Sequence, residues 1–265
     1  MGYTIKMLYL HGKNKVMPTI EDNRLCWGKT YDWSDSGDEW SQAWGGTEYL
    51  WYGTILPRIL SFIPTGNILE IAPGYGRCTQ FLINLCKHLD VVDLNVNCIE
   101  SCKKRFLNNS HISYHINDGK SLDTIAENSI DFIFSWDSLV HCEADVLNSY
   151  LSGSARILKP GAWGFIHHSN IGQYYDISAG MLSCENIHAR GETMSAQLFR
   201  EYSEKNGLFC VRQEIINWGG DILNDCFSVF IKNTINTNYT AKYIENPEFH
   251  KECNRIKNVA DFFKM

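Results

Sequence analysis

Short apolar runs alternate with longer amphipathic segments between residues 66 and 232, and no other feature of the sequence constrains the fold as strongly. The pattern predicts seven strands (67–71, 89–94, 112–116, 130–134, 162–168, 208–218 and 226–232) and four helices (77–88, 97–107, 145–158 and 195–206). Strands that alternate with helices favour a mainly parallel sheet covered on both faces. Only residues 219–225 separate the last two strands, so these are expected to pair antiparallel. The prediction is an α/β, doubly wound, seven-stranded sheet with an antiparallel edge strand.

Differences in residue composition divide the chain into three parts. Residues 1–65 hold five of the eight tryptophans and are expected to form an aromatic N-terminal cap or lid. Residues 66–232 form the predicted core, and residues 233–265 are polar and predict a peripheral extension with one or two helices. For each tryptophan of the first part, a place in a structural core is the alternative to a place in a lid.

Composition excludes several classes of protein. The formal net charge of −6 argues against a nucleic-acid-binding surface. No apolar run reaches the roughly 18 residues that a membrane helix needs, so no membrane span is expected. Residues 1–10 lack the features of a signal peptide, which predicts a cytoplasmic protein. The ten cysteines include no Cys-x-x-Cys pair, so reduced thiols and no metal site are expected, with a divalent metal at Asp137 and His141 as the minority alternative.

Three successive strand ends carry the groups that bind a nucleoside. Gly74 and Gly76 follow the first strand, where glycine lets the backbone approach a ligand. Asp93 ends the second strand at a spacing typical of a carboxylate that binds ribose hydroxyls, and Asp118 follows the third strand, where it could bind an adenine amino group. The alternative is that both aspartates only stabilise turns or helix starts.

These motifs together resemble those of class I S-adenosylmethionine-dependent methyltransferases. The resemblance rests on Leu69–Gly76, Val92–Leu94, Asn117–Gly119 and Leu158–Gly161, and it departs from the family pattern at Ala72, which stands where a glycine is usual. It implies a Rossmann-like fold and S-adenosyl-L-methionine as cofactor. The cofactor-binding residues that it implies are Glu70, Ala72, Gly74, Gly76, Asp93, Leu94, Asp118, Gly119 and Trp136.

A finer resemblance concerns the acceptor. Segments 44–46, 51–58, 135–141 and 164–170 are similar to those of methyltransferases from bacterial surface-polysaccharide (capsule) clusters, which methylate sugars or their substituents, including an O-methyl phosphoramidate group. It implies a small acceptor that contains sugar or phosphate. The residues expected to bind it are Trp44, Tyr52, Arg58 and Asn170, although Arg58 could instead pair with a surface acid.

Methylation of an alcohol requires a base, and three histidines are expected near the cleft. His141 follows the fourth strand, while His167 and His168 end the fifth and should point to opposite faces of the sheet. His168 is the predicted base with His141 as its partner, and for each histidine a role in the core is the alternative. Asp137 is expected to orient a histidine, to bind the acceptor, or to cap the next helix.

The leading hypothesis is therefore an O-methyltransferase acting on a saccharide precursor or a phosphoramidate-type substituent. The alternatives are a catalytically silent module that binds partners, a methyltransferase for another small molecule, a nicotinamide-dependent oxidoreductase, and a nucleic-acid methyltransferase. The last lacks the Asn/Asp-Pro-Pro-aromatic signature after the fourth strand. Whether the protein forms a homo-oligomer is left open.

Overall fold

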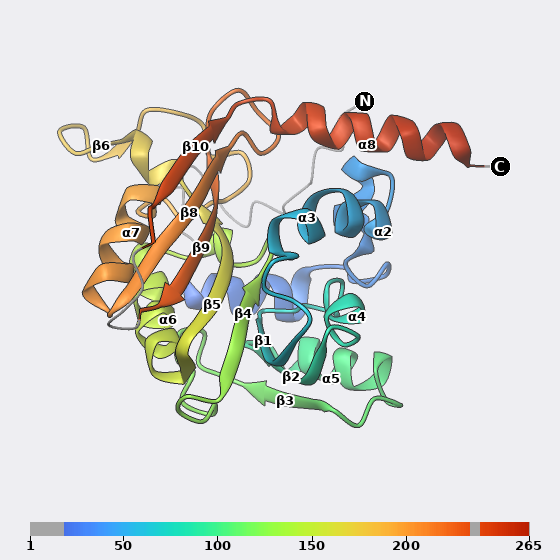
Figure 1. Cartoon of the computed structure of the whole chain (residues 1–265). Helices are drawn as coiled ribbons and strands as arrows, with labels where there is room; N and C mark the ends of the chain where they lie inside the picture. The colour runs from blue at the N-terminus through green and yellow to red at the C-terminus, as the bar shows by residue number, and fades with distance from the viewer. Residues whose placement is uncertain (1–18, 234–238, 265) are drawn as a thin grey trace.

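The computed structural model describes residues 19–233 and 239–264, and its centre is a twisted sheet of eight strands (Figure 1). The strands are β1 (Thr65–Ile71), β2 (Cys86–Asp93), β3 (Ile112–Ile116), β4 (Ile130–Ser135), β5 (Leu158–Ser169), β8 (Leu208–Ile216), β9 (Asp225–Lys232) and β10 (Lys242–Asn246). Their order is β10-β8-β9-β5-β4-β1-β2-β3, and only β9 runs antiparallel to its neighbours. A separate hairpin joins β6 (Tyr175–Asp176) to β7 (Met181–Leu182). The predicted α/β, doubly wound fold is confirmed.

The sheet differs from the prediction at its antiparallel end. The last two predicted strands do pair antiparallel, but β9 lies inside the sheet, between β5 and β8. The edge is β10, an eighth strand that the C-terminal extension adds parallel to β8. The polar sequence of this extension hides the strand, because an edge strand is solvated along one side and needs no apolar run.

Helices cover both faces of the sheet (Figure 1). One face carries α6 (Ala144–Ile157) and α7 (Ala196–Lys205), and the other carries α2 (Thr47–Leu50), η3 (Trp51–Ile55), α3 (Leu56–Ile59), α4 (Thr79–Leu82), α5 (Val96–Arg105) and α8 (Phe249–Phe263). The alternation of strand side chains supplies both cores, so that Ile68 belongs to one and Leu69 to the other. The helix predicted at 77–88 is reduced to the short α4, because Cys86–His88 already pair with β1.

The part of the N-terminal region that the structure describes has two roles. Helix α2, η3 and α3 belong to the main core, through Leu50, Trp51 and Ile55. Preceding them, α1 (Ile20–Leu25), the π-helical turn η1 (Cys26–Thr30) and η2 (Asp38–Trp44) supply one side of the cavity described below. Residues 1–10, which are expected to contain no signal peptide, lie outside the described residues. None of the helices in the described ranges has the length and apolar character needed to cross a membrane.

Candidate active site

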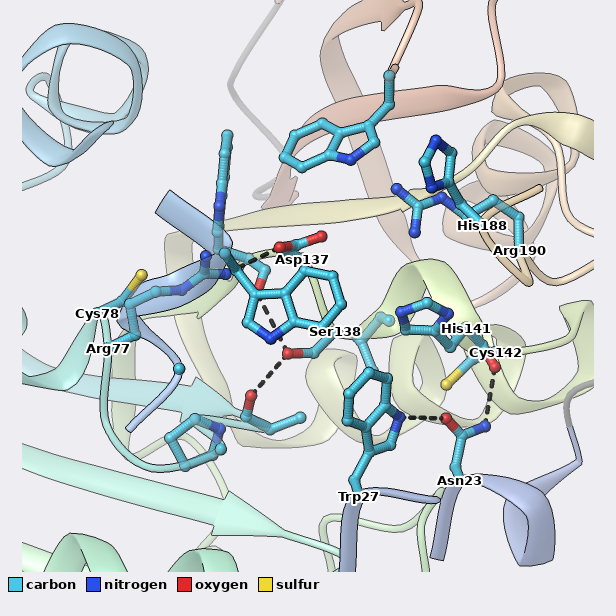
Figure 2. A pocket seen from close by; sticks show the side chains of 18 of the residues that line it. Asn23, Trp27, Arg77, Cys78, Asp137, Ser138, His141, Cys142, His188 and Arg190 are labelled. Atoms are coloured by element: carbon cyan, nitrogen blue, oxygen red, sulfur yellow. Dashed lines mark hydrogen bonds and ion pairs between the residues drawn. The ribbon is translucent and has the colours of Figure 1, made fainter. Parts of the chain in front are cut away.

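A cavity of about 340 Å³ lies at the carboxyl ends of the parallel strands, and residues of the N-terminal segment such as Asn23 and Trp27 form part of its wall (Figure 2). Its walls come from the loops after β1, β2, β3 and β4, from η1 and η2, and from the segments 187–190 and 217–219. The predicted site residues that line it are Trp44, Glu70, Ala72, Gly74, Asp93, Leu94, Gly119, Trp136, Asp137 and His141.

The loop after β1 has the conformation that glycine permits. Gly74 has φ of 59° and Gly76 has φ of 89°, and Ala72 adopts φ of 57° although it is not glycine. The Gly74 N–H faces Asp93 and donates to its carboxylate at 3.3 Å. Gly76 does not line the cavity; a Cβ there would lie 2.6 Å from the ring of Phe106. The role of Gly76 is therefore close packing against the helix, which corrects the prediction that it lines the cofactor.

Two buried carboxyl groups flank this loop. Burial raises the pKa of Asp93 to about 7, although the N–H groups of Asn95 and Gly74 oppose the shift. Burial likewise raises the pKa of Glu70 to about 7, against the hydroxyl of Thr79, which donates to the carboxylate at 2.6 Å. Within residues 19–233 and 239–264, no cationic side chain lies at hydrogen-bond distance from either carboxyl group, so both are placed to accept hydrogen bonds from a ligand.

The end of the third strand is organised differently from the prediction. The Asp118 side chain is exposed and accepts hydrogen bonds from the N–H groups of Lys120 and Ser121, at 3.0 and 2.7 Å. It therefore stabilises a turn outside the cavity, which was the alternative interpretation of this aspartate. Gly119 does line the cavity, where its backbone lies against Ile20.

His168 does not reach the cavity. Its ring is fully buried on the α7 face of the sheet, stacked on Phe199 at 4.4 Å between centroids, and its Nε2 lies 2.8 Å from the Ser228 hydroxyl. Burial lowers the pKa of His168 to about 3. This placement corrects the prediction that His168 is the base. Strand alternation directs the neighbouring side chain, His167, to the side of the sheet that carries the cavity, where it contacts Trp136 and Trp218.

His167 lies behind the cavity wall as a link between buried groups. Its Nδ1 accepts the N–H of Asp137, so its Nε2 carries the hydrogen and donates to Asp225 at 3.0 Å. Asp225 also accepts two hydrogen bonds from Arg190, at 2.9 and 2.6 Å. Both nitrogens of His167 are occupied, and the ring is fully buried, so it is not free to take a proton from an acceptor.

His141 is the predicted histidine that lines the cavity. Its Nδ1 lies 2.9 Å from the carbonyl oxygen of Ala189, to which it donates. Burial and then Arg190 lower its pKa to about 4, so the ring is neutral at physiological pH. With Nδ1 protonated, Nε2 holds a lone pair, and no hydrogen bond to it is found among the residues that the structure describes.

Asp137 stands between two guanidinium groups in the cavity (Figure 2). It adopts φ of 55°, a left-handed conformation that is strained for an aspartate, and its carboxylate accepts a hydrogen bond from Arg77 Nη2 at 2.9 Å. The opposite wall carries His188 and Arg190. Asp137 orients His167 through its backbone N–H, and it does not cap a helix.

Three of the four residues predicted to bind the acceptor lie elsewhere. Tyr52 is 61% exposed, and its ring contacts the ring of Phe81 edge-to-face. Arg58 joins β8 to α8 through Glu214 and Glu252, with N–O distances of 2.7 and 2.9 Å. These two residues are structural or exposed, so their predicted roles are corrected.

Asn170 is the third of these residues. Its side-chain amide donates a hydrogen bond to the carbonyl of Leu223 at 2.8 Å and accepts one from the N–H of Ala196 at 2.7 Å. Asn170 thereby joins the loop before β9 to the start of α7. It does not line the cavity, so the predicted role in binding the acceptor is corrected. Trp44 is the one predicted acceptor residue that lines the cavity.

The N-terminal segment closes the cavity with aromatic rings. Trp27, Trp33 and Trp40 line it, and Trp33 stacks on Tyr75 at 4.5 Å between centroids with an interplanar angle of 5°. Asn23 donates to the carbonyl of His141 at 2.9 Å and so ties this segment to the loop after β4. These rings therefore line the cavity, and their role as a lid stays a prediction.

Sequence reasoning missed several cavity residues. They are Arg77, Tyr150, His188, Arg190 and Trp218. Arg77 directly follows the glycine loop, which was a usable signal. The segment containing His188 and Arg190 belongs to no predicted strand or helix, and only folding brings it to the strand ends.

Metal ligands are not gathered anywhere in the described part of the chain. No group of three or more His, Cys, Asp or Glu side chains there could hold a metal ion.

Comparison with known proteins identifies the same region. Residues 68–161 match a family model described as a methyltransferase domain, and these residues include the glycine loop, Asp93 and His141. A search of curated proteins finds none that matches the chain significantly.

Solved structures share the fold at low sequence identity. A protein assigned as a sarcosine dimethylglycine methyltransferase from Galdieria sulphuraria has a TM-score of 0.54 at 14% identity, covering 79% of this chain and 100% of that one. A chain from the complex of the Haloferax volcanii Trm112 methyltransferase activator with a methyltransferase has a TM-score of 0.53 at 16% identity, covering 77% and 99%. The N-methyltransferase NodS from Bradyrhizobium japonicum has a TM-score of 0.50 at 18% identity, covering 69% and 95%.

The cavity fits the cofactor of this enzyme class. Asp93 offers a buried carboxylate beside a left-handed glycine loop, and Arg77 Nη1 is buried without a partner among the described residues. A ribose diol and an amino-acid carboxylate would satisfy these two groups. Residues 68–161 thus match a methyltransferase domain within a Rossmann-like fold that solved methyltransferases share, which supports an S-adenosylmethionine-dependent methyltransferase.

Proposed function

We propose that this enzyme is an O-methyltransferase for a small saccharide precursor or a phosphoramidate-type substituent, as in surface-polysaccharide biosynthesis. The observation that carries the proposal is His141, a neutral histidine with its Nε2 open to a cavity that also holds the cofactor-binding groups. A histidine in this state can accept the proton of a hydroxyl group as its oxygen is methylated.

Aromatic rings support a saccharide acceptor. Trp44 and Trp218 line the cavity with ring centroids 5.5 Å apart, and Trp136 lies 6.1 Å from Trp218. Such rings stack on the C–H faces of sugars and exclude water from the reacting atoms. The cavity volume of about 340 Å³ suits a small molecule.

The residues divide the work of the reaction. When bound, S-adenosylmethionine supplies a methyl group on a sulfonium sulfur, which an acceptor oxygen attacks in line as the carbon–sulfur bond breaks. Asp93 and Glu70 bind and orient the cofactor at one end of the cavity. The aromatic rings of the N-terminal segment hold the acceptor close to the methyl group. His141 Nε2 takes the proton that an alcohol loses.

Calorimetry with S-adenosylhomocysteine and an assay with nucleotide sugars test the proposal. We expect binding, and transfer of methyl from S-adenosylmethionine to an acceptor oxygen, located by mass spectrometry. Absence of binding at millimolar ligand contradicts the proposal, as does methylation of nitrogen or carbon. An anionic phosphoramidate oxygen needs no base, so the activity of His141→Ala distinguishes the two acceptor classes: a hydroxyl acceptor loses its methylation, and a phosphoramidate retains most of it.

A further inference from the structure

We infer that the acceptor carries an oxyanion, a carboxylate or a phosphate-type group, and that Trp136, His188 and Arg190 bind it. The inference rests on the proposed function and adds to it the chemical group by which the acceptor is recognised. These three residues line the cavity away from the glycine loop.

Unpaired polar atoms gather at this cavity. Among the described residues, five buried side-chain atoms lack a hydrogen-bond partner, and three of them belong to cavity residues: Arg77 Nη1, Trp136 Nε1 and His188 Nε2. Proteins pair the large majority of such atoms, so a cluster of unpaired ones points to a missing ligand. Arg77 lies beside the glycine loop and is assigned above to the cofactor. The inference assigns His188 to the acceptor, and with it Trp136, which the family resemblance had placed at the cofactor.

Arg190 adds a charged donor to the same wall. Its side chain is 3% exposed, and its Nε and Nη2 are bound to Asp225 at 2.9 and 2.6 Å. The structure shows no hydrogen bond from Nη1 to any described residue, and the guanidinium extends toward the cavity (Figure 2). The bond to Asp225 fixes the plane of the guanidinium, so that its remaining N–H groups are preorganised for an oxygen ligand.

The surrounding charges define what this site selects. Asp225 pairs with Arg190 and Asp137 pairs with Arg77, so neither guanidinium contributes a full uncompensated charge. Burial and then Arg190 lower the pKa of His188, which favours its neutral form. Recognition therefore depends on the N–H donors of Trp136 and Arg190, and on His188 in the tautomer that carries its hydrogen on Nε2; such donors bind an anionic oxygen more strongly than a neutral one.

The adjacent aromatic wall takes the uncharged part of the acceptor. Arg190 lies over the ring of Trp218, with Cζ 5.7 Å from its centroid, and the Trp136 ring meets Trp218 edge-to-face with the centroids 6.1 Å apart. A sugar ring stacked there would place a substituent beside the donors of Trp136 and Arg190. The site thus matches a sugar acid or a sugar phosphate.

The test uses the full chain saturated with S-adenosylhomocysteine. Tryptophan fluorescence and calorimetry measure the binding of glucuronate, glucose 1-phosphate and, as a neutral probe, methyl glucoside. We expect at least one anionic probe to bind about tenfold or more tightly than the neutral one. The comparison of glucuronate with glucose 1-phosphate tells a carboxylate from a phosphate. Equal binding of all three, or no binding of either anion, overturns the inference.

Two variants locate the site. Trp136→Phe removes the indole N–H and keeps an aromatic ring, and His188→Ala removes a side chain from a loop; each is expected to weaken anion binding about three- to tenfold. The matched control is Trp163→Phe, which removes an indole N–H beside Phe62, outside the cavity.

The outcomes separate the two proposals. Anion binding unchanged in both cavity variants overturns the inference. If the wild-type protein does not bind S-adenosylhomocysteine at all, the proposed function is contradicted instead.

Discussion

The backbone N–H of Asp137 donates a hydrogen bond to Nδ1 of His167, 3.2 Å away. This bond fixes the tautomer of a buried histidine, whose other nitrogen then donates to Asp225. A continuous hydrogen-bonded path thus joins the strained residue in the cavity to the pair of Asp225 with Arg190. The geometry of the site depends on this path, in which His167 links the backbone of Asp137 to the carboxylate of Asp225.

Replacing His141 tests the base. For a hydroxyl acceptor, His141→Gln should lower kcat by about 10²- to 10⁴-fold, because the proton acceptor is lost, while calorimetry should show unchanged binding of S-adenosylhomocysteine. Since burial lowers the pKa of His141 to about 4, the base stays neutral and active as pH falls from 8 to about 6. The control is His115→Gln on β3, where the ring pairs with Asp90 outside the cavity, and activity should persist. Equal loss in both variants would contradict the assignment.

Asp93→Asn separates cofactor binding from stability. Binding of S-adenosylhomocysteine should weaken by about 10- to 100-fold, as expected when a charged hydrogen-bond acceptor is removed. Folding raises the pKa of Asp93 from 3.8 to about 7, so the unfolded chain ionises first and stability falls as pH rises between these values. The variant should therefore be more stable than wild type at pH 8, by roughly 1–4 kcal/mol, and the difference should vanish near pH 4.

Urea denaturation at several pH values and calorimetry measure the two effects of Asp93→Asn. Asp90→Asn on the same strand is the matched control, because its carboxylate pairs with His115 and does not line the cavity. Tight binding by Asp93→Asn would remove Asp93 from the cofactor site.

The buried pair of Asp225 and Arg190 should dominate acid stability. Asp225→Asn is expected to lower the free energy of unfolding by about 3–5 kcal/mol, because Arg190 is left buried without its anion. Despite burial, Arg190 and His167 lower the pKa of Asp225 to about 2, so this stabilisation is present above its unfolded pKa and is lost as pH falls from 3.8 to about 2. Glu100→Gln, which breaks an exposed pair with Lys103, should cost less than about 1 kcal/mol in the same urea titrations. Similar losses in both would argue against the buried network.

Arg58→Met tests whether this arginine is structural. Removing the cation leaves Glu214 and Glu252 half-buried without a partner, so the free energy of unfolding should fall by roughly 2–4 kcal/mol, while affinity for S-adenosylhomocysteine should not change. Denaturation and calorimetry provide the two measurements. The control is Arg24→Met, whose exposed pair with Glu21 should contribute almost nothing. Weaker acceptor binding without loss of stability would restore the predicted role in substrate binding.

Local patterns predicted the strands well and some helices poorly. The strand at residues 112–116 was predicted with its observed bounds, because apolar runs flanked by turn residues are a local signal. The helix expected at 77–88 failed because its last residues gain more from pairing with β1 than from continuing a helical turn. β10 was missed because its strand character comes from its neighbour β8.

The candidate site shows the same division at the level of single side chains. Asp93 is at a strand end and lines the cavity, as its position predicted, whereas Asp118 in the same kind of position turns into solvent. The sequence indicated that His167 and His168 point to opposite faces, but it could not say which face holds the cavity.

By itself, the sequence determined the parallel sheet, the glycine loop and the edge of the sheet where the cavity lies, because hydrophobic periodicity and backbone freedom are properties of neighbouring residues. Only the tertiary structure decided that His141 lines the cavity and that Arg58 pairs with Glu252 of α8. It also decided that Arg190, from a loop distant in the sequence, lies at the cavity. These choices depend on packing and charge between segments far apart in the chain, and no local pattern encodes them.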